Sequence, residues 1–435
     1  MTQGWIGAER PGDGRPAGRV RRVSDVSPSA IPGARVAIGY DCFFPLTVGG
    51  AERWYRSLAE TLVERGATVT YLTRRQWDGP APAIPGIKLV AVSRKDDLYD
   101  EKGVRKLLPG LRFGWGLFRY LLRNRSSFDV VQVGNFPYWS VIATRLALAG
   151  TKVPVVIDWH EIWSFRFWRS YVGPVIGTIG FLIQRLCLAL TPLALVSLPT
   201  NARRIRAAGM RKEVVLLPGY LPSDMVEEDG GADAAVPADP PHVLFAARHI
   251  HDKGIDLLPG LAAELYARRP DVELVIAGGG PGTPELEATL AADAPGAQTR
   301  LVGFVEESEL KRLMREATCV VIPSRREGYG LVLVEASRYG TPSAVAGFEE
   351  NLCTDNVVAG VNGYVAKPPT AERLATVVLQ ILDDGMALRR STLAWHRKTA
   401  PGSTMDHSVQ TVIDLYEQLM VSRPRAAGRP EESPA

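Results

Sequence analysis

The sequence predicts an α/β protein built from two doubly wound domains, each with a parallel β-sheet between layers of helices. Short runs of β-branched residues alternate with amphipathic stretches along most of the chain, an order that is typical of βαβ units. This alternation is interrupted near the middle of the chain and then starts again. The length of 435 residues agrees with two to three domains of ordinary size.

The composition is that of an ordinary globular protein. It includes 46% hydrophobic and 23% charged residues, which excludes a wholly disordered chain, a collagen and a coiled coil. The net charge of +4 is too small to indicate nucleic-acid binding. The cysteines are scattered without a C-x-x-C pair, which argues against a zinc site or a disulfide framework and favours a reducing, cytoplasmic compartment. They are Cys42, Cys187, Cys319 and Cys353.

Residues 1–34 are expected to form a disordered N-terminal tail. They are polar and rich in Gly, Pro, Ser and Arg, and they lack the apolar segment of a signal peptide. Residues 35–222 are expected to form the first Rossmann-like domain, with a helix at Ala51–Arg65 that Gly66 ends. Its strands are expected at Arg35–Gly39, Thr68–Leu72, Ile87–Val92, Val130–Val133, Val155–Ile157 and Leu195–Ser197.

The most apolar stretch lies near the end of this domain, from Tyr171 to Val196. Three glycines, two prolines, Gln184 and Arg185 interrupt it. A helix that spans a membrane needs about 20 consecutive apolar residues. A buried helix followed by a strand is therefore expected here instead.

Residues 223–240 are expected to be an acidic linker, because they hold six acidic residues, no basic ones and few large apolar ones. The alternation resumes over residues 241–385, the second Rossmann-like domain. A helical segment at 386–422, with its main helix at Ser408–Met420, and a disordered tail at 423–435 are expected to follow. Ligands of such sheets bind beyond the carboxyl ends of the strands, so a site is expected in the cleft between the domains. The second domain is expected to have strands at His242–Phe245, Glu273–Ala277, Thr299–Gly303, Cys319–Ile322 and Pro342–Val345, and helices at Leu257–Ala267, Pro284–Ala291, Glu307–Glu316, Leu331–Tyr339 and Ala371–Leu382.

The most informative string of the second domain is PSRREGYGLVLVEASRYGTP, residues 323–342. A strand is expected to end at Ile322 and a helix to begin near Leu331. Glu327 lies in the loop and Glu335 lies eight residues later on the helix. A helix N-terminus offers free N–H groups that suit a phosphate, and a carboxylate beside it can accept the hydroxyls of a ribose. Two glutamates at this spacing alone could arise by chance, so the hypothesis rests on the whole string.

This string resembles the E-x7-E motif of the retaining glycosyltransferases of family 4. The resemblance implies the GT-B fold, in which an acceptor-binding first domain and a nucleotide-sugar-binding second domain face each other across a cleft. It also implies that Glu335 holds the ribose of the donor and that Glu327 contacts the donor sugar. The donor site is further expected to include Tyr329 and, through backbone N–H groups facing the diphosphate, Gly330, Leu331 and Val332.

A second string, FAARHIHDKG at residues 245–254, looks like the family's G-R-x4-K-G motif. The resemblance implies that Arg248 and Lys253 clamp the donor diphosphate. Cleavage of a sugar–phosphate bond leaves negative charge on the nucleotide, and a guanidinium and an ammonium can stabilise this charge as it develops. The string departs from the motif at Ala247, where glycine is usual, but it keeps both cations.

Two further strings lie in the first domain. Gly49 and Gly50 open the first helix and resemble the family's glycine-rich loop, whose backbone N–H groups approach the donor phosphate. His160 follows a strand at the position where the family commonly has a histidine and then an acid, and it is expected to contact the donor sugar or the acceptor. A lone histidine is usually structural, so both interpretations of His160 stay open. In the second domain, Val305 is expected near the nucleobase.

The resemblance runs from about Arg35 to Leu382. It implies a retaining enzyme that moves a hexose from a UDP- or GDP-sugar to an acceptor hydroxyl in the synthesis of a glycolipid, a polysaccharide or a glycosylated metabolite. The chain has no D-x-D motif, so no metal is expected, and the nucleotide sugar is a co-substrate rather than a cofactor. Two alternatives stay open: a catalytically silent binding or scaffold protein of the same fold, and a different enzyme such as a sugar phosphorylase, a hydrolase or an epimerase.

The acceptor is expected to be a carbohydrate, a lipid-linked molecule or a small molecule. The segments Arg105–Arg125 and Trp163–Tyr171 both mix aromatic with basic residues. Such segments suit a membrane interface or an anionic lipid-linked acceptor, which predicts peripheral contact with the inner face of the membrane. The alternative is that the aromatic residues pack on the sheet while the arginines stay in water. Both interpretations stay open.

Overall fold

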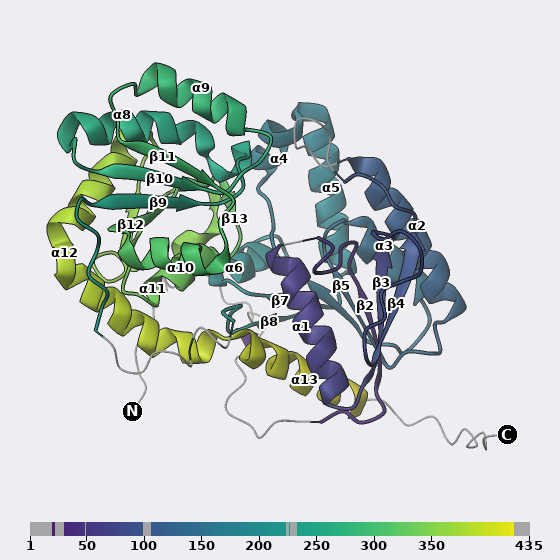
Figure 1. Ribbon diagram of the computed structural model, residues 1–435. Helices are drawn as coiled ribbons and strands as arrows, with labels where there is room; N and C mark the ends of the chain where they lie inside the picture. Colours follow the sequence, from purple (N-terminus) through teal and green to yellow (C-terminus); the bar gives the residue numbers. More distant parts are fainter. Residues whose placement is uncertain are drawn as a thin grey trace, which may run out of the picture.

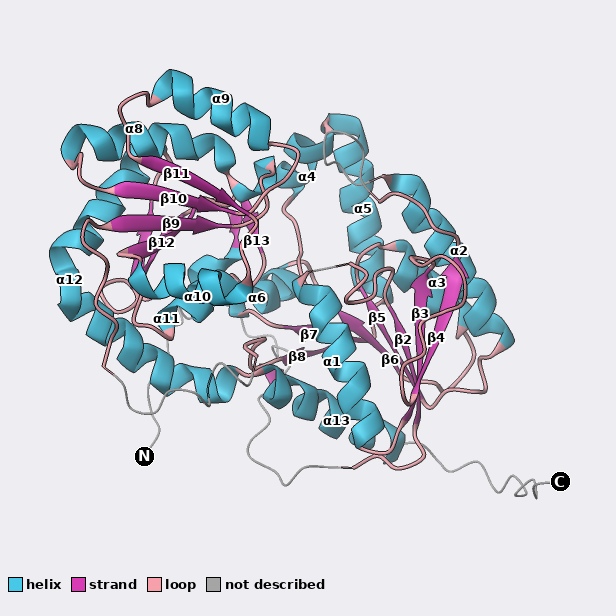
Figure 2. Ribbon diagram, in the orientation of Figure 1, coloured by secondary structure: helices cyan, strands magenta, loops and turns pink. Residues whose placement is uncertain are grey.

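The computed structural model describes residues 20–21, 30–47, 49–98, 106–222, 226 and 233–421. Two α/β domains lie side by side, and the last described helix returns to the first domain (Figure 1). Each domain has a parallel sheet with helices on both faces (Figure 2). The predicted α/β class with two doubly wound Rossmann-like domains is therefore confirmed.

The first domain contains an eight-stranded parallel sheet in the order β1-β8-β7-β6-β5-β2-β3-β4. After the edge strand β1, the chain enters the middle of the sheet at β2, builds outward through β3 and β4, and then crosses to β5 and continues through β6 and β7 to β8. Inner strands such as β5 are buried at every position, because helices cover both faces. The strands are β1 (Val20–Arg21), β2 (Arg35–Gly39), β3 (Thr68–Arg74), β4 (Ile87–Ser93), β5 (Val130–Gly134), β6 (Val155–Asp158), β7 (Leu193–Val196) and β8 (Glu213–Leu216).

The two faces of this sheet carry different sets of helices. On one face, α1 turns Trp54, Tyr55 and Leu58 toward the sheet, and α13 packs beside it in the same hydrophobic cluster. On the other face, helices α2 to α6 share a second cluster with the strands. The helices are α1 (Gly50–Glu64), α2 (Leu107–Arg123), α3 (Trp139–Ala147), α4 (Phe165–Val172), α5 (Pro174–Leu190), α6 (Pro199–Ala207) and α13 (Met405–Val421).

The second domain contains a six-stranded parallel sheet in the order β11-β10-β9-β12-β14-β16. Helices α8, α9 and α12 cover one face, and α10 and α11 cover the other. The short strands β13 (Arg326–Glu327) and β15 (Glu350–Asn351) pair apart from this sheet. The other elements are β9 (His242–Ala246), β10 (Glu273–Ala277), β11 (Thr299–Gly303), β12 (Cys319–Ile322), β14 (Ser343–Ala346), β16 (Gly363–Ala366), α8 (Leu258–Arg268), α9 (Thr283–Asp293), α10 (Glu307–Glu316), α11 (Leu331–Ser337), α12 (Ala371–Thr399) and the 3-10 turns η1 (His251–Lys253), η2 (Ile255–Leu257), η3 (Leu352–Asn356) and η4 (Ala400–Ser403).

The C-terminal part of the chain connects the domains. Helix α12 kinks at Gly385, where φ is 50° and ψ is −133°, and continues to η4. Helix α13 then packs against α1 and β5 of the first domain. There the Tyr416 hydroxyl donates a hydrogen bond to Gln132 Oε1. The first domain is thus completed by residues from the far end of the sequence.

Part of the predicted N-terminal tail takes part in the fold. Val20–Arg21 pairs with β8 at the edge of the sheet. Ile31 is buried, and the Gly33 N–H donates to the Gly66 carbonyl at 2.9 Å. The prediction of a disordered tail is therefore wrong for these residues, because their backbone groups are paired. The remainder of that tail, like the tail predicted at 423–435, lies outside the described residues.

The second half of the predicted linker packs on the second domain. The Ala235 N–H donates to the Tyr339 carbonyl at 3.1 Å, and the Ala238 N–H donates to the Glu316 carbonyl at 2.8 Å. Most of the first half of the linker lies outside the described residues.

The apolar stretch from Tyr171 to Val196 forms a helix followed by a strand, as predicted, but the helix is not buried. One side of α5 packs on α3 and α4, while the opposite side faces outward. The prediction of a buried helix is therefore wrong for that side. In the described part of the chain, no helix is both long and apolar enough to cross a bilayer. The exposed residues are Val175, Ile176, Ile179, Leu182 and Leu186, at 49–71%.

Candidate active site

A cavity of about 490 Å³ lies between the two domains. Residues that follow β2, β6, β7 and β8 line one side of it, and residues that follow β9 and β12 line the other. This is the edge of the two sheets at which their strands end, where open α/β sheets bind ligands. Tyr40, Trp54 and Tyr220 give the wall of the first domain an aromatic character.

The cavity brings most of the predicted site residues together from strings far apart in the sequence. The glycine-rich loop and His160 come from the first domain, and the basic string and the glutamate loop come from the second. The predicted residues that line the cavity are Gly49, Gly50, His160, Arg248, Lys253, Glu327, Tyr329, Gly330, Leu331 and Val332.

Glu335 and Val305 are not among the residues that line the cavity. Glu335 is half-buried on α11, about one helical turn beyond Leu331. Val305 is half-buried against the hydrophobic cluster beneath α10 and α11. Their contacts with the ribose and the nucleobase stay predictions.

Lys253 and Glu327 form an ion pair at the cavity wall. Lys253 Nζ lies 2.6 Å from Glu327 Oε2, and each side chain is about 20% exposed. The Ser324 hydroxyl donates to the same carboxylate oxygen at 3.4 Å. The pair fixes the ammonium between the basic string and the glutamate loop, so an anion in the cavity can compete with Glu327 for Lys253.

Two left-handed glycines fix the loops that carry these side chains. Gly254, directly after Lys253, has a φ of 69°, and a Cβ there would lie 2.1 Å from the Pro323 carbonyl oxygen. Gly330 has a φ of 75°, and a Cβ there would lie 2.4 Å from the Cys353 Cβ. Only glycine fits either position. At Gly254 this lets the basic string lie against Pro323, in the segment that leads to Glu327. At Gly330 it lets α11 begin at the cavity.

Two arginines give the second domain's wall further positive charge. Arg248 is exposed to the cavity, and its guanidinium makes no ion pair or hydrogen bond with the rest of the described chain. Arg326 lies 3.0 Å from Asp252 Oδ2 and 3.4 Å from Glu161 Oε2. Arg248 is therefore available to an anionic ligand, whereas Arg326 is held by carboxylates of both domains.

His160 is held by neighbours in its own domain. Its Nε2 lies 3.2 Å from the Tyr55 hydroxyl, and its carbonyl accepts a hydrogen bond from Asn201 Nδ2 at 2.7 Å. Burial lowers the pKa of the His160 imidazole below its ordinary value of 6.5, although the Asp158 carboxylate opposes this shift. The imidazole is thus neutral at pH 7 and offers the cavity a hydrogen-bonding group without charge.

A buried polar network lies beneath His160. Asp158 Oδ2 accepts hydrogen bonds from Gln132 Nε2 at 2.7 Å and from Trp54 Nε1 at 3.3 Å. Burial raises the pKa of the Asp158 carboxyl, while His160 and the hydrogen bonds to it act in the opposite direction. Because Gln132 also accepts a bond from Tyr416, the network extends from α13 to the cavity wall.

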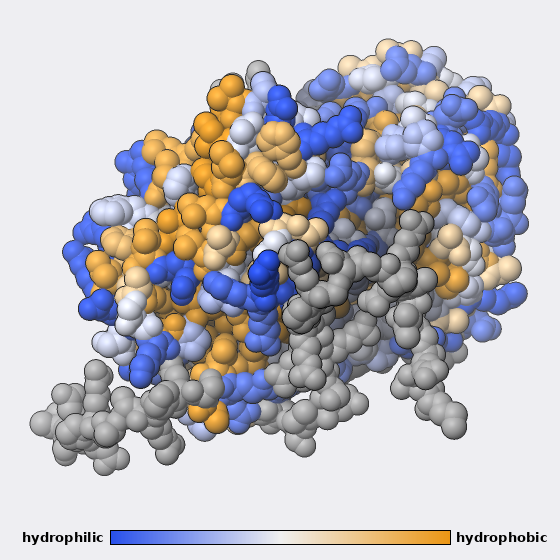
Figure 3. Space-filling view, turned by 180° about the vertical axis from the view of Figure 1, so that it is seen from behind, coloured by the Kyte–Doolittle hydropathy of each residue, from blue (hydrophilic) through white to orange (hydrophobic). Residues whose placement is uncertain are grey.

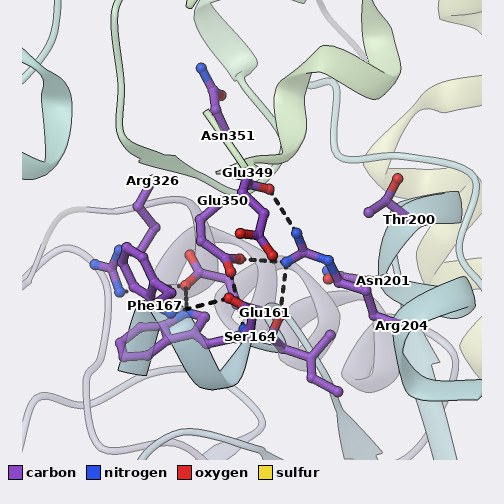
Figure 4. A network of polar contacts seen from close by, with 12 residues as sticks. Glu161, Ser164, Phe167, Thr200, Asn201, Arg204, Arg326, Glu349, Glu350 and Asn351 are labelled. Atoms are coloured by element: carbon purple, nitrogen blue, oxygen red, sulfur yellow. Dashed lines mark hydrogen bonds and ion pairs between the residues drawn. The ribbon is translucent and has the colours of Figure 1, made fainter. Parts of the chain in front are cut away.

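A second network joins the two domains beside the cavity, and no sequence pattern predicted it. Arg204 of α6 pairs with Glu350 of β15 and donates to the Glu349 carbonyl at 2.7 Å (Figure 4). The Ser164 N–H donates to Glu350 Oε1 at 3.1 Å, and the Glu350 side chain is only 3% exposed. Nearly 150 residues separate Arg204 from its partners, so no local pattern could have paired them.

Two further contacts connect the first domain to the second in this region. Thr200 donates to the Asp355 carboxylate through its N–H at 2.8 Å and its hydroxyl at 2.6 Å. Arg326 lies over the Trp163 ring, 5.0 Å from its centroid. The domains therefore meet through buried and half-buried polar contacts in the arrangement described here.

No metal is expected in this site. In the residues that the structure describes, no group of three or more His, Cys, Asp or Glu side chains is arranged to hold a metal ion. His249 and His251 lie in the basic string. His249 bonds to the Thr283 hydroxyl at 2.9 Å, and His251 lies 3.6 Å from Asp256. Metal independence stays a prediction.

Two family models match the chain, one over each domain. Residues 49–220 match the glycosyl transferase 4-like domain, and residues 230–394 match the glycosyl transferases group 1. The chain belongs to the family 4 type of glycosyltransferases. This confirms the predicted family and the prediction of a glycosyltransferase enzyme, whereas the match of each string to a family motif stays a prediction.

Similar proteins support this family. A D-inositol 3-phosphate glycosyltransferase of Xylanimonas cellulosilytica is 29% identical over 407 residues, which cover 86% of this chain and 93% of the relative. Sucrose-phosphate synthase of Thermosynechococcus elongatus has a similar structure, with a TM-score of 0.70 and 18% identity, over 90% of this chain and all of that one. Anabaena HepE, solved in complex with UDP and glucose, is also similar in structure. It has a TM-score of 0.59 and 16% identity, over 88% of this chain and all of that one. These structural neighbours confirm the GT-B fold of this glycosyltransferase.

Proposed function

We propose that this glycosyltransferase moves a hexose from a UDP- or GDP-sugar to an acceptor hydroxyl, with retention of configuration and without a metal. The observation that carries the proposal is the cavity itself. Arg248, Lys253 and Glu327 of the second domain line it together with His160 of the first, and Lys253 is paired with Glu327.

Arg248 and Lys253 bind the diphosphate of the donor in this proposal. Arg248 is open to the cavity, and Lys253 can leave its contact with Glu327 as a phosphate approaches. The backbone N–H groups of Gly330, Leu331 and Val332 approach the same diphosphate, with Tyr329 beside them. The cations stabilise the negative charge that develops on the leaving nucleotide diphosphate, which is where catalysis needs it.

The remaining parts of the donor have separate partners. Glu327, once released from Lys253, accepts hydrogen bonds from hydroxyls of the donor sugar. Glu335 binds the ribose, and the backbone at Val305 contacts the nucleobase. Gly49 and Gly50 bring backbone N–H groups from the first domain to the phosphate.

Sugar transfer in this proposal takes place on one face of the ring. The bond between the anomeric carbon and the phosphate oxygen breaks, the acceptor oxygen bonds to the same face of that carbon, and the acceptor proton passes to the leaving phosphate. No protein side chain has to act as the base. The neutral imidazole of His160 orients the hydroxyls of the reacting sugar, and the domain arrangement limits access of water.

The acceptor in this proposal is a carbohydrate, a lipid-linked molecule or a small molecule, and it enters from the first domain. The aromatic wall at Tyr40, Trp54 and Tyr220 suits the apolar faces of a sugar ring. We place the reaction in the cytoplasm, at the inner face of the membrane.

Calorimetric titration of the full chain with UDP, GDP, ADP and their sugars, in the presence of EDTA, tests the donor site. Wild type is compared with Arg248→Ala and Glu335→Ala, and with Arg269→Ala as a control on the far side of the domain, where Arg269 pairs with Asp271. We expect one nucleotide to bind without metal, both site variants to weaken it at least tenfold, and the control to behave as wild type. Absence of binding by every nucleotide would overturn the proposal and favour a silent binding protein.

Retention is tested separately. Once the donor is known, candidate acceptors are incubated with it, and the anomeric proton of the product is examined by NMR. An α-linked donor should give an α-linked product, and a β-linked product would contradict the retaining mechanism.

A further inference from the structure

The outward side of α2 carries an apolar stripe. Leu108, Leu111, Trp115 and Leu122 recur at helical spacing and are 41–61% exposed. The opposite side of the same helix is also apolar and packs on the sheet. A helix at the surface of a protein in water normally turns a polar face outward, so this stripe is unusual.

Helix α5 repeats the pattern. Ile176, Ile179, Leu182 and Leu186 follow its outward side at helical spacing and are 49–60% exposed. Arg185 is the one charged residue of the helix. Helix α3 lies between α2 and α5 and exposes Leu146. We call these two stripes, with Leu146 between them, the outer helix face.

The outer helix face forms one continuous layer. Helices α2, α3 and α5 pack side by side on the same face of the first sheet. Seen from behind, orange residues gather over the half of the molecule that these helices occupy, with blue residues among them (Figure 3). Soluble monomers rarely expose apolar surface gathered in this way unless it binds a partner.

The helices of this side of the domain carry charges of a single sign. The segments 107–128, 136–154 and 165–212, which contain helices α2 to α6, hold 14 Lys or Arg and no Asp or Glu. Three of these arginines, Arg112, Arg203 and Arg204, pair with carboxylates from other segments, namely Asp96, Asp355 and Glu350. Arg119 and Arg123 are exposed on α2, and Arg166 and Arg169 are exposed on α4. A second copy of the chain docked on the same face would bring like charges together. The charge pattern therefore selects an anionic partner.

We propose that the outer helix face docks on the anionic surface of a lipid bilayer. The leucines, isoleucines and Trp115 enter the boundary between headgroups and acyl chains, and the arginines bind lipid phosphates. The helices lie along the surface and do not cross the membrane. The apolar area and the positive charge are two independent contributions to this binding.

Docking here leaves the cavity open. None of the stripe residues of α2 or α5 lines the cavity. Helix α4 adjoins α5, and its N-cap Ser164 binds Glu350 of the second domain. The first domain would thus be held at the membrane with the second still able to take up a donor. Because the two surfaces are separate, failure of membrane binding and failure of donor binding are distinguishable.

The test is sedimentation of the full chain with vesicles of phosphatidylcholine containing 30% or no phosphatidylglycerol. We expect wild type to sediment with the anionic vesicles and to be released at high salt. Ile179→Ser/Leu182→Ser/Leu186→Ser should reduce binding at least tenfold. Arg119→Gln/Arg123→Gln should reduce it about fivefold for each arginine removed.

The matched control is Val236→Ser/Tyr266→Ser, which removes two exposed apolar residues of the second domain and should bind as wild type. If the α5 variant fails to fold, Leu111→Ser/Trp115→Ser tests the same face from α2. Wild type that stays in the supernatant with anionic vesicles would overturn the proposal. Equal loss of binding in the control would overturn it too, as would a wild-type dimer that the α5 variant dissociates and that ignores vesicles.

Discussion

The two domains share one architecture but differ at both of their surfaces. The outward helices of the second domain carry ion pairs between neighbouring turns, such as Arg268–Glu264 on α8 and Lys311–Glu307 on α10. The helices α2 to α5 of the first domain hold no acidic residue, so no such pair can form among them. The exterior of the second domain is thus typical of a surface in water, whereas the outer helix face of the first domain suits the lipid bilayer proposed above.

The cavity-facing surfaces differ as well. The second domain presents Arg248, Lys253 and Arg326 to the cavity. Among the described residues of the first domain that line it, none is Lys or Arg, and His160 is neutral. Charge is therefore divided between the domains: cations face the cavity in the second domain and lie on the exterior of the first.

The sharpest test of this contrast compares the two sides of α2. Phe113→Ala removes a fully buried ring and should destabilise the protein by about 3–5 kcal/mol. Leu111→Ser, two residues earlier on the exposed side, should change stability by less than about 0.5 kcal/mol. Urea denaturation of both variants checks this. A large loss for Leu111→Ser would mean that the outward stripe is covered within the protein itself.

Removing a cavity cation should affect catalysis more than stability. Lys253→Ala is expected to lower kcat by about 10²–10³-fold, because a donor that stabilises the developing charge is lost. Lys253→Arg should restore part of the rate. Transfer assays at saturating donor check this, with Arg269→Ala as the control. An unchanged kcat in Lys253→Ala would show that the cationic wall is not where charge develops.

The polar contacts between the domains should be coupled. Arg204→Ala leaves the buried Glu350 carboxylate without its partner and should cost about 3 kcal/mol. Removing both side chains should cost less than the sum of the single changes, by about 2 kcal/mol. A double-mutant cycle followed by urea denaturation measures the coupling. Additive effects would mean that the two side chains stabilise the fold separately.

The smallest expected effect concerns pH. The pKa of His160 is lowered by burial, so the unfolded state binds more protons between that pKa and 6.5. Its contribution to stability is therefore complete above pH 6.5 and is lost as the pH falls through this window. NMR titration of labelled histidine, with His160→Gln to assign the signal, should place the pKa below 6.5. Asp158→Asn should lower it further, and an unchanged value would contradict the proposed interaction.

Much of the fold could be predicted from the sequence, because buried parallel strands leave a clear pattern. The strands at Arg35–Gly39 and Glu273–Ala277 have the predicted bounds. The cavity residues were found because their strings stand directly after strands. Each string is local, so its position on the sheet follows from the alternation of strands and helices.

What the sequence did not predict depends on contacts between distant residues. A helix that is apolar on all sides is normally buried, so the sequence pattern did not predict that one side of α5 is exposed. The pairing of Arg204 with Glu350 and the return of α13 to the first sheet are likewise invisible in local patterns. For Glu335 and Val305, the spacing places them near the site but does not determine which way they face.

The position of α13 has a consequence for biosynthesis. The ribosome makes most of the first domain before the second, yet the helix that packs on α1 and β5 follows the second domain in the chain. Tyr416, buried against that sheet, cannot reach Gln132 until the second domain has been synthesised. Until then, the part of this sheet face that α13 covers stays exposed, while α1 already packs on the rest of it. A chain released before residue 405 would leave that part of the face open to aggregation and proteolysis, although every residue that lines the cavity would be present.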